Sequence, residues 1–313
     1  MIEYFLIIMN RGLILVFFIL IFYIGFIGFS DFSKISNNLS DFNYNLIPVI
    51  FLFVISAFMI LGIRQFFLLK QIGISLSIRD NLKLYFSGLS MIISPGGAGQ
   101  LIKSYYLKKK YNYEIKETLP LVFVERFLDL ICITTLIIFS LLFIQNIEII
   151  FLASIVSLLI IMIILIIKFK KLFTLVTNQL SKISFFKKFV KDSSDTYNSL
   201  NKMTSTKSLL LGYGLGMISF SFDAIAVYFI FMAFDVDLNF FKIIASIYPS
   251  ILYGALSFIP GGVGVTELTA LRLLTDEGIS TSLSSTIILT TRFFTIWFVT
   301  VLGFAITKIL LKK

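Results

Sequence analysis

"SPGGAGQ" (residues 94–100) and "IPGGVGV" (residues 259–265) each end an apolar run that is too short to cross a bilayer. Pro ends a helix because it lacks an N–H group, and Gly adopts the positive φ angles that a tight reversal requires. A broken backbone at membrane depth is tolerated only where protein or water satisfies its polar groups. The motifs therefore predict two helical hairpins with tips inside the membrane, formed by Pro95, Gly96, Gly97, Gly99, Pro260, Gly261, Gly262 and Gly264.

The rest of the chain has the composition of a membrane protein. Of its 313 residues, 58% are hydrophobic and 14% are charged, which is too few charges for the surface of a soluble domain. We expect a single all-α transmembrane domain over residues 1–313. The apolar runs predict six full membrane helices and two shorter pieces, at 12–29, 47–69, 119–144, 149–168, 208–234 and 282–307, and at 84–94 and 243–259.

Residues 12–29 are interpreted as the first membrane helix and not as a cleavable signal peptide, because the apolar run is too long. Lys and Arg then set the orientation, since they accumulate in cytoplasmic segments. Residues 70–118 are basic, and residues 168–207 hold nine Lys and two Asp. Both basic segments lie in the cytoplasm only if residues 84–107 and 243–272 return to the side of the membrane from which they enter.

This topology has three consequences. It predicts one re-entrant hairpin from the cytoplasm, a second from outside, and both termini in the cytoplasm of a cell with the chain in its plasma membrane. Residues 168–207 are also amphipathic, so we expect them to lie on the anionic cytoplasmic surface.

The two halves of the chain resemble each other. A shift of about 165 residues lays the first glycine motif on the second and the run 47–69 on 208–234. Within one residue, it also lays Arg126 on Arg292. An odd number of membrane crossings lies between a position in the first half and the matching position in the second half, so the two halves face opposite sides. We therefore predict inverted repeats over about 47–144 and 208–307, an architecture found in many transporters.

Charged residues interrupt the predicted spans, and these are the candidate site residues. They are Glu125, Arg126 and Asp129 in the third span, Asp223 in the fifth, Glu267 after the second tip, and Arg292 in the last span. Charges at membrane depth are costly and usually face partners or cavities. The spacing allows the pairs Arg126–Asp129 and Glu267–Arg292. Such pairs are either purely structural or hold an Arg that also receives a phosphate.

Several kinds of chemistry are absent from the sequence. There is no His, and the single Cys132 lies in a predicted helix, which excludes His-based acid–base catalysis and cysteine metal sites. We therefore expect no metal, no cofactor, no enzymatic activity and no nucleic-acid partner.

The most specific pieces of the chain are "FIPGGVGVTE" (258–267) and "VERFLD" (124–129). Together they resemble the lysylphosphatidylglycerol synthase transmembrane family, and the resemblance covers about residues 10–310. This family includes the flippase half of bacterial multiple-peptide-resistance proteins. In the family the first hairpin usually carries Gly-Glu followed by Arg. Here Gln100 and Lys103 occupy those places, which keeps the positive charge and loses the acid.

The resemblance implies a flippase that moves a charged or phosphate-bearing lipid between leaflets. The expected substrate ligands are Arg126 and Arg292, together with Glu125, Asp129, Glu267, Lys103 and Gln100. The expected partners are anionic or polyprenyl-phosphate lipids. Homo-oligomerisation and association with a membrane synthase or glycosyltransferase stay open.

Two alternatives remain at this point. One is a polyprenyl-phosphate-dependent membrane glycosyltransferase, for which Asp31 and Asp41 in the first outer loop offer the carboxylates. The other is an accessory subunit of such an enzyme.

Overall fold

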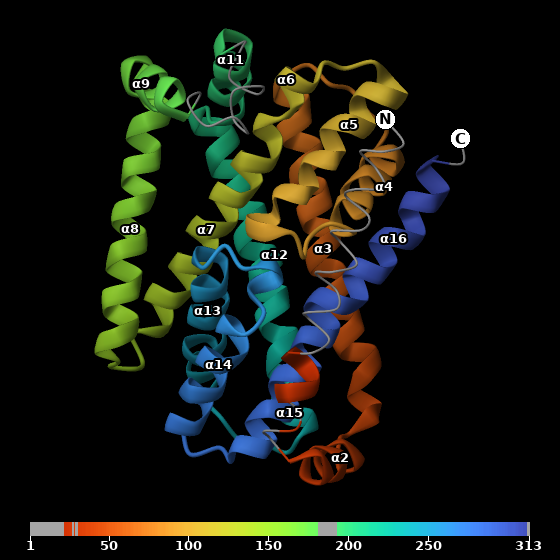
Figure 1. The fold of residues 1–313 in the computed structure, drawn as a ribbon, viewed down its shortest axis with the longest axis vertical. Coiled ribbons are helices and arrows are strands. Elements are labelled where there is room, and N and C mark those ends of the chain that lie inside the picture. Colours follow the sequence, from red (N-terminus) through yellow and green to blue (C-terminus); the bar gives the residue numbers. More distant parts are fainter. Residues whose placement is uncertain (1–21, 27, 29–30, 181–192, 312–313) are drawn as a thin grey trace.

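The structure is a computed structural model and describes residues 22–26, 28, 31–180 and 193–311. The described residues form helices and no strand (Figure 1). The helices of the first half are α2 Phe32–Ser40, η1 Tyr44–Leu46, α3 Ile47–Gln71, α4 Ile78–Leu89, η2 Pro95–Leu101, α5 Ile102–Tyr111, α6 Ile115–Thr118 and α7 Pro120–Ser140. Those that follow are α8 Ile147–Lys168, α9 Lys170–Leu180, α11 Ser193–Met203, α12 Thr206–Ala233, α13 Phe240–Leu256, η3 Pro260–Gly262, α14 Val265–Asp276, α15 Thr281–Arg292, η4 Phe293–Trp297 and α16 Phe298–Leu311.

Four helices in the described part are long and apolar enough to cross a membrane: Tyr44–Gln71, Ile147–Lys168, Thr206–Ala233 and Thr281–Ile309. They coincide with four of the predicted spans, so the prediction of an all-α membrane protein is confirmed. A fifth predicted span, 119–144, forms the 21-residue helix α7, which carries three charged residues. The first, 12–29, lies largely outside the described residues. The count of six spans therefore stays a prediction.

The last of these helices is not uniform. α15 ends at Arg292, a π-helical turn follows at Phe293–Trp297, and α16 completes the helix. In a π-helical turn each hydrogen bond spans one residue more than in an α-helix, and such turns occur often at functional sites.

Two hairpins enter the bundle from opposite ends. α4 and α5 run between the upper end of Figure 1 and its middle, whereas α13 and α14 run between the lower end and the middle. Their tips, η2 and η3, contact each other. This is the arrangement that an inverted repeat with re-entrant hairpins predicts. The repeat and the position of the tips in a bilayer stay predictions.

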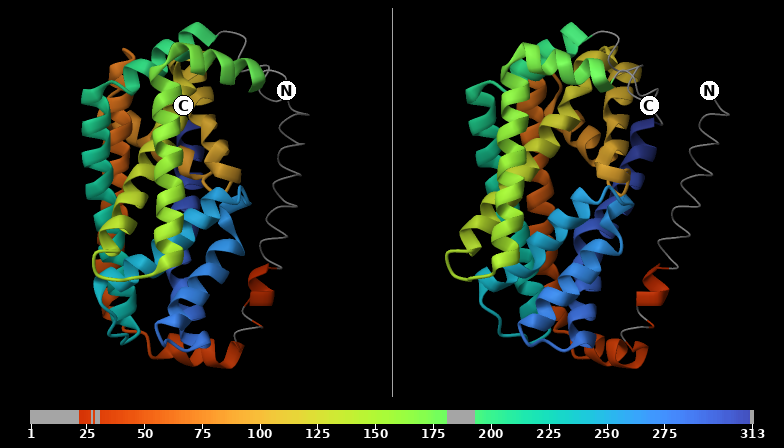
Figure 2. Two further views of the ribbon diagram at one scale, coloured as in Figure 1. Left: turned by 90° about the vertical axis from the view of Figure 1, so that its left-hand side faces the viewer. Right: turned by 60° about the vertical axis from the view of Figure 1, so that its left-hand side comes forward.

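The two halves interlock and do not lie side by side as separate units. α3 packs along α12, where the Ser219 hydroxyl donates a hydrogen bond to the Ala57 carbonyl at 2.8 Å. α16 packs against α4 so closely that a Cβ at Gly303 would collide with the Ser90 backbone nitrogen. The views in Figure 2 show the long helices α3 and α12 running through the body of the molecule. One continuous apolar core therefore joins both halves.

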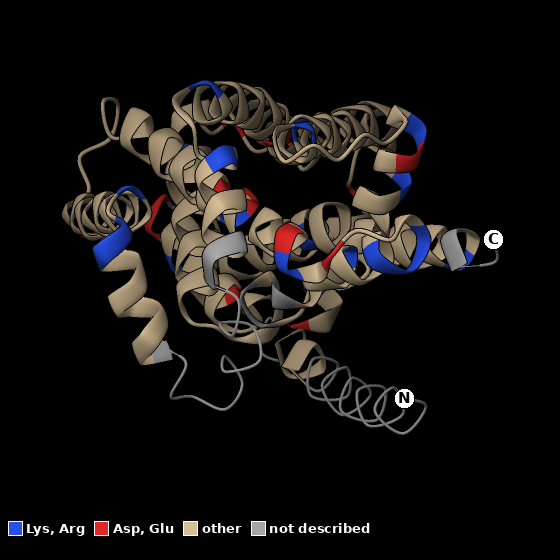
Figure 3. Cartoon of the chain, turned by 90° about the horizontal axis from the view of Figure 1, so that it is seen from above, with Lys and Arg blue, Asp and Glu red and all other residues tan. Residues whose placement is uncertain are grey.

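The two ends of the bundle differ in charge. The upper end of Figure 1, seen from above in Figure 3, carries the basic residues of α5 and α9 and is called the basic end: Lys108, Lys109, Lys110, Lys170 and Lys171. The opposite end, with α2 and the α14–α15 connection, carries more acids, namely Asp31, Asp41, Glu148, Asp235, Asp237, Asp276 and Glu277. Of the basic segment 168–207, the structure describes α9 and α11, and residues 181–192 lie outside the described residues.

Candidate functional site

The glycine motifs form the tips of both hairpins. Pro95 begins η2 and Pro260 begins η3, the positions where a missing N–H costs nothing. Positive φ angles occur at Gly97 (69°), Gly261 (63°), Gly262 (65°) and Gly264 (89°). Gly96 lies within η2, and the Gly99 N–H donates to the Ser94 hydroxyl at 2.6 Å. The reversals therefore depend on glycine conformations at both tips.

Gly262 is the most restricted of these glycines. A Cβ there would lie 2.6 Å from Thr266 Oγ1 and 3.0 Å from the Gly254 Cα. Positive φ alone costs an L-residue about 1–2 kcal/mol. We expect Gly262→Ala to lower the thermal unfolding temperature of the purified protein clearly. Gly214→Ala is the matched control, because Gly214 lies inside α12 with nothing within 4 Å and Ala favours a helix. Equal melting of Gly262→Ala and wild type would contradict the strained tip.

A cavity of about 460 Å³ lies between the two tips, within the range of small-ligand pockets. Its walls come from α3, α7, α12, α13 and α15 and from both hairpins, and most lining side chains are apolar. The polar and charged lining residues are Tyr85, Ser94, Arg126, Asp129, Ser219, Asp223, Ser250, Thr266, Thr291, Arg292 and Thr295. The cavity therefore presents one Arg from each half of the chain.

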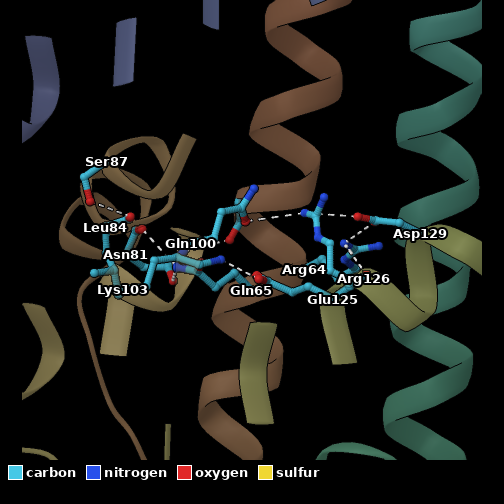
Figure 4. Close-up of polar contacts among 11 residues, drawn as sticks. Arg64, Gln65, Asn81, Leu84, Ser87, Gln100, Lys103, Glu125, Arg126 and Asp129 are labelled. Atoms are coloured by element: carbon cyan, nitrogen blue, oxygen red, sulfur yellow. Dashed lines mark hydrogen bonds and ion pairs between the residues drawn. The ribbon is translucent and has the colours of Figure 1, made fainter. Parts of the chain in front are cut away.

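On the first half, two arginines share one acid (Figure 4). Asp129 Oδ1 accepts from Arg64 Nη2 at 2.6 Å, and Asp129 Oδ2 lies 3.1 Å from Arg126 Nη2. Arg64 is fully buried, whereas a third of the Arg126 side chain is exposed. Arg126 Nη2 also donates to Gln100 Oε1 at 3.5 Å. Arg64 therefore binds Asp129 on the side away from the cavity, and Arg126 lines the cavity.

A second ion pair lies behind this group. Lys103 of α5 and Glu125 of α7 are both buried and bonded to each other. Lys103 Nζ also donates to Gln65 Oε1 at 3.0 Å, and Gln65 Nε2 donates to Asn81 Oδ1 at 3.0 Å. None of these side chains lines the cavity. This chain of bonds ties the first hairpin to α3 and α7.

On the second half, Arg292 binds the second hairpin directly. Its Nε lies 2.7 Å from Glu267 Oε1, and its Nη2 donates to the Gly261 carbonyl at the tip. Glu267 is fully buried and accepts from the Gly264 N–H at 2.7 Å and from the Tyr23 hydroxyl at 2.8 Å. The pair therefore fixes the tip and the start of α14.

Comparison with known proteins identifies the family of the chain. The profile described as "Lysylphosphatidylglycerol synthase TM region" matches residues 12–303, which is nearly the whole chain. The chain belongs to the lysylphosphatidylglycerol synthase transmembrane family. It is also similar to a "UPF0104 membrane protein" of Methanothermobacter thermautotrophicus, with 34% identity over 89 residues. That alignment spans 28% of this chain and 27% of the relative. The predicted family membership is confirmed.

The structure separates the predicted site residues of this family member into two groups. Arg126, Asp129, Asp223 and Arg292 line the cavity. The others lie outside the cavity wall: Gln100 beside Arg126, Glu267 beside Arg292, and Lys103 with Glu125 in a buried pair. The pairs Arg126–Asp129 and Glu267–Arg292 that the spacing allowed are both present.

Sequence reasoning missed Arg64 and Tyr248. Arg64 interrupts the apolar run "ILGIRQFF" (60–67). An Arg within a membrane span predicts an acidic partner, so this signal was present in the sequence. Tyr248, which donates to Asp223 at 2.9 Å, gave no signal among so many aromatic residues. The described residues contain no group of three or more His, Cys, Asp or Glu side chains that could hold a metal ion.

Proposed function

We propose that this protein moves a phosphate-bearing lipid between the two leaflets of the membrane. The observation that carries the proposal is the cavity between the hairpin tips, with Arg126 from one half and Arg292 from the other. The lipid headgroup occupies this cavity while its acyl or prenyl chains stay in the bilayer. Family membership supports a lipid-related membrane function.

The arginines have donors left for a phosphate. Arg126 uses Nη2 for Asp129 and Gln100, and its Nε is buried without a partner among the described residues. The Thr291 hydroxyl, which lines the cavity next to Arg292, is also buried and unpartnered there. Because a guanidinium presents five N–H donors in a fixed fork, an Arg held by an acid still binds a phosphate with its remaining donors.

The different charge of the two ends supports one orientation of the chain in the membrane. Lys and Arg accumulate on the cytoplasmic side, so the basic end faces the cytoplasm of the cell. The first hairpin then enters from the cytoplasm and the second from outside, and both termini are cytoplasmic. Each hairpin acts as a gate on its own side of the headgroup cavity.

The glycosyltransferase alternative needs a carboxylate that faces the substrate. Asp31 instead caps α2, where it accepts from the Ser33 N–H at 3.2 Å and pairs with Lys34 at 3.4 Å. Neither Asp31 nor Asp41 lines the cavity. We therefore propose transport without covalent chemistry.

Reconstitution tests the function. Liposomes that contain phosphatidylglycerol with a fluorescent headgroup-proximal label are treated with dithionite, which bleaches the outer leaflet only. Bleaching of the inner pool is expected with the protein and not in protein-free liposomes. A labelled polyprenyl phosphate gives the second substrate arm. Formation of a new lipid product in either arm would favour the enzyme alternative. An inner leaflet that stays fluorescent with both lipids would contradict the proposal.

The orientation is tested with single cysteines in a Cys132→Ala background. Ser40→Cys and Asp276→Cys are exposed at the end opposite the basic end, and Lys110→Cys and Lys171→Cys are exposed at the basic end. An impermeant maleimide added to intact cells is expected to label the first two, and the last two only after permeabilisation. Labelling of Lys110→Cys in intact cells would contradict a first hairpin that enters from the cytoplasm.

A further inference from the structure

Asp223 is an acidic residue within a membrane-spanning helix, and it forms no ion pair with a Lys or Arg of the described residues. It lies near the middle of α12 and lines the cavity together with Arg126 and Arg292. Its Oδ2 accepts a hydrogen bond from the Tyr248 hydroxyl of α13 at 2.9 Å. That hydroxyl also lies 3.2 Å from the Phe220 carbonyl, so it bridges α12 to the second hairpin.

The other acids at this depth are already neutralised. Each has a cationic partner: Glu125 has Lys103, Asp129 has Arg64 and Arg126, and Glu267 has Arg292. A proton on any of them would break an ion pair. A proton on Asp223 breaks none, so Asp223 is the one of these four acids that binds a proton with the least disruption.

The charge balance of the site leads to the same residue. With Asp223 ionised, four acids (Glu125, Asp129, Asp223, Glu267) balance four cations (Arg64, Lys103, Arg126, Arg292). An anionic headgroup that enters a largely apolar cavity adds an uncompensated charge, which is costly to bury. A proton on Asp223 restores the balance.

We propose that Asp223 is a proton-binding site, and that it takes up a proton when a phosphate-bearing headgroup occupies the cavity. The proposal rests on the proposed function and adds its coupling ion. Binding linkage is reciprocal, so a lower pH strengthens headgroup binding by the same free energy by which the headgroup strengthens proton binding.

The charged and titratable groups on the elements packed against α12 do not offer a competing site. α7 contributes Arg126 and Asp129 to the cavity wall, α15 contributes Arg292, and α13 contributes Tyr248, which donates to Asp223. Arg64 of α3 lies outside the cavity wall and is paired with Asp129. η1 and α11 contact α12 but do not line the cavity. The arginines stay charged at any relevant pH, and Asp129 is held by two of them. Proton uptake on headgroup binding is therefore assigned to Asp223.

The two halves differ at this position. The shift of about 165 residues that relates the glycine motifs places Phe58 of α3 where the second half has Asp223, and both side chains line the cavity. Only the second half therefore couples headgroup to proton, which gives a pH gradient a means to favour one direction of transport.

Proton uptake is measured by isothermal titration of the protein in phosphatidylcholine nanodiscs with dihexanoyl phosphatidylglycerol. At each pH, two buffers with different ionisation enthalpies give the number of protons bound per lipid. For wild type we expect the number of protons taken up per lipid to pass through a maximum as the pH is varied, at a value that approaches about one. Asp223→Asn, an isosteric change that still accepts from Tyr248, is expected to bind lipid with no proton uptake.

Asp276→Asn, an exposed acid at the far end, is the matched control and is expected to behave like wild type. Tyr248→Phe keeps the acid and is expected to keep the uptake with its maximum at a different pH. Lipid binding without proton uptake in wild type, or equal uptake in wild type and Asp223→Asn, would overturn the proton site and leave the proposed function intact. No lipid binding by folded wild type would overturn both.

Discussion

Replacing Arg126 with Gln is expected to lower lipid translocation about 10- to 100-fold, because a hydrogen bond to a charged group contributes about 1.5–3 kcal/mol. The fold should survive, since Asp129 keeps its 2.6 Å bond to Arg64 and a third of the Arg126 side chain is already exposed. Arg126→Lys is expected to be nearly as poor in transport, because an ammonium keeps the charge but cannot form the planar fork. The dithionite assay and thermal unfolding measure both effects.

Arg64→Gln provides the contrast on the same acid. Arg64 does not line the cavity and is buried, so its loss should lower the unfolding temperature more than the loss of Arg126 does. Arg79→Gln, an exposed Arg in the first turn of α4, controls for the change of residue type. Wild-type transport by Arg126→Gln would show that the guanidinium is a scaffold and not a phosphate ligand.

Removing Arg292 alone is expected to be the most damaging single change in the site. Glu267 is fully buried, and breaking a buried ion pair by deleting one partner costs about 3–5 kcal/mol. Arg292→Gln also loses the bond to the Gly261 carbonyl at the tip. We expect little folded protein for Arg292→Gln, measured as monodisperse yield after extraction.

The double variant Arg292→Gln with Glu267→Gln removes both charges together and is expected to recover most of that yield. The oxygen of the amide that replaces the Glu267 carboxylate keeps an acceptor for the Gly264 N–H, and the Tyr23 hydroxyl, which both donates and accepts, then receives a hydrogen bond from the amide nitrogen. Transport should nevertheless stay lost, because the cavity then lacks one of its two arginines. Full transport by the double variant would demote Arg292 to a structural role.

The sequence predicted the all-α membrane fold and the limits of three long helices well, because apolar length is a local signal. α3, α8 and α12 begin and end within three residues of the predicted spans. The sequence could not decide which partner each intramembrane charge takes, since that depends on helix rotation. Asp129 was expected to pair with Arg126, and it does, but Arg64 from a span 65 residues earlier is its closer partner.

The pairing of Asp129 with Arg64 changes the expected effect of neutralising Arg126 and Asp129 together. From spacing alone, neutralising Arg126 and Asp129 together removes a complete ion pair. In the structure the same double change would leave Arg64 buried without an acid. Lys103 was similarly expected at the substrate, but Gly88 lets its side chain pass along α4 to Glu125, since a Cβ there would lie 2.7 Å from Lys103 Cδ. Only the packing of α4 against α5 reveals this path.

The contact between α4 and α16 has a consequence for how the protein is made. More than 200 residues separate Leu89 from Phe298, so α4 leaves the ribosome long before the helix that covers it. Contacts of such sequence separation form late, and incomplete membrane chains expose surfaces that are later buried. At Gly303 the two backbones touch, with no side chain between them. A chain released before α16 is synthesised would therefore carry a first hairpin with this surface of α4 uncovered.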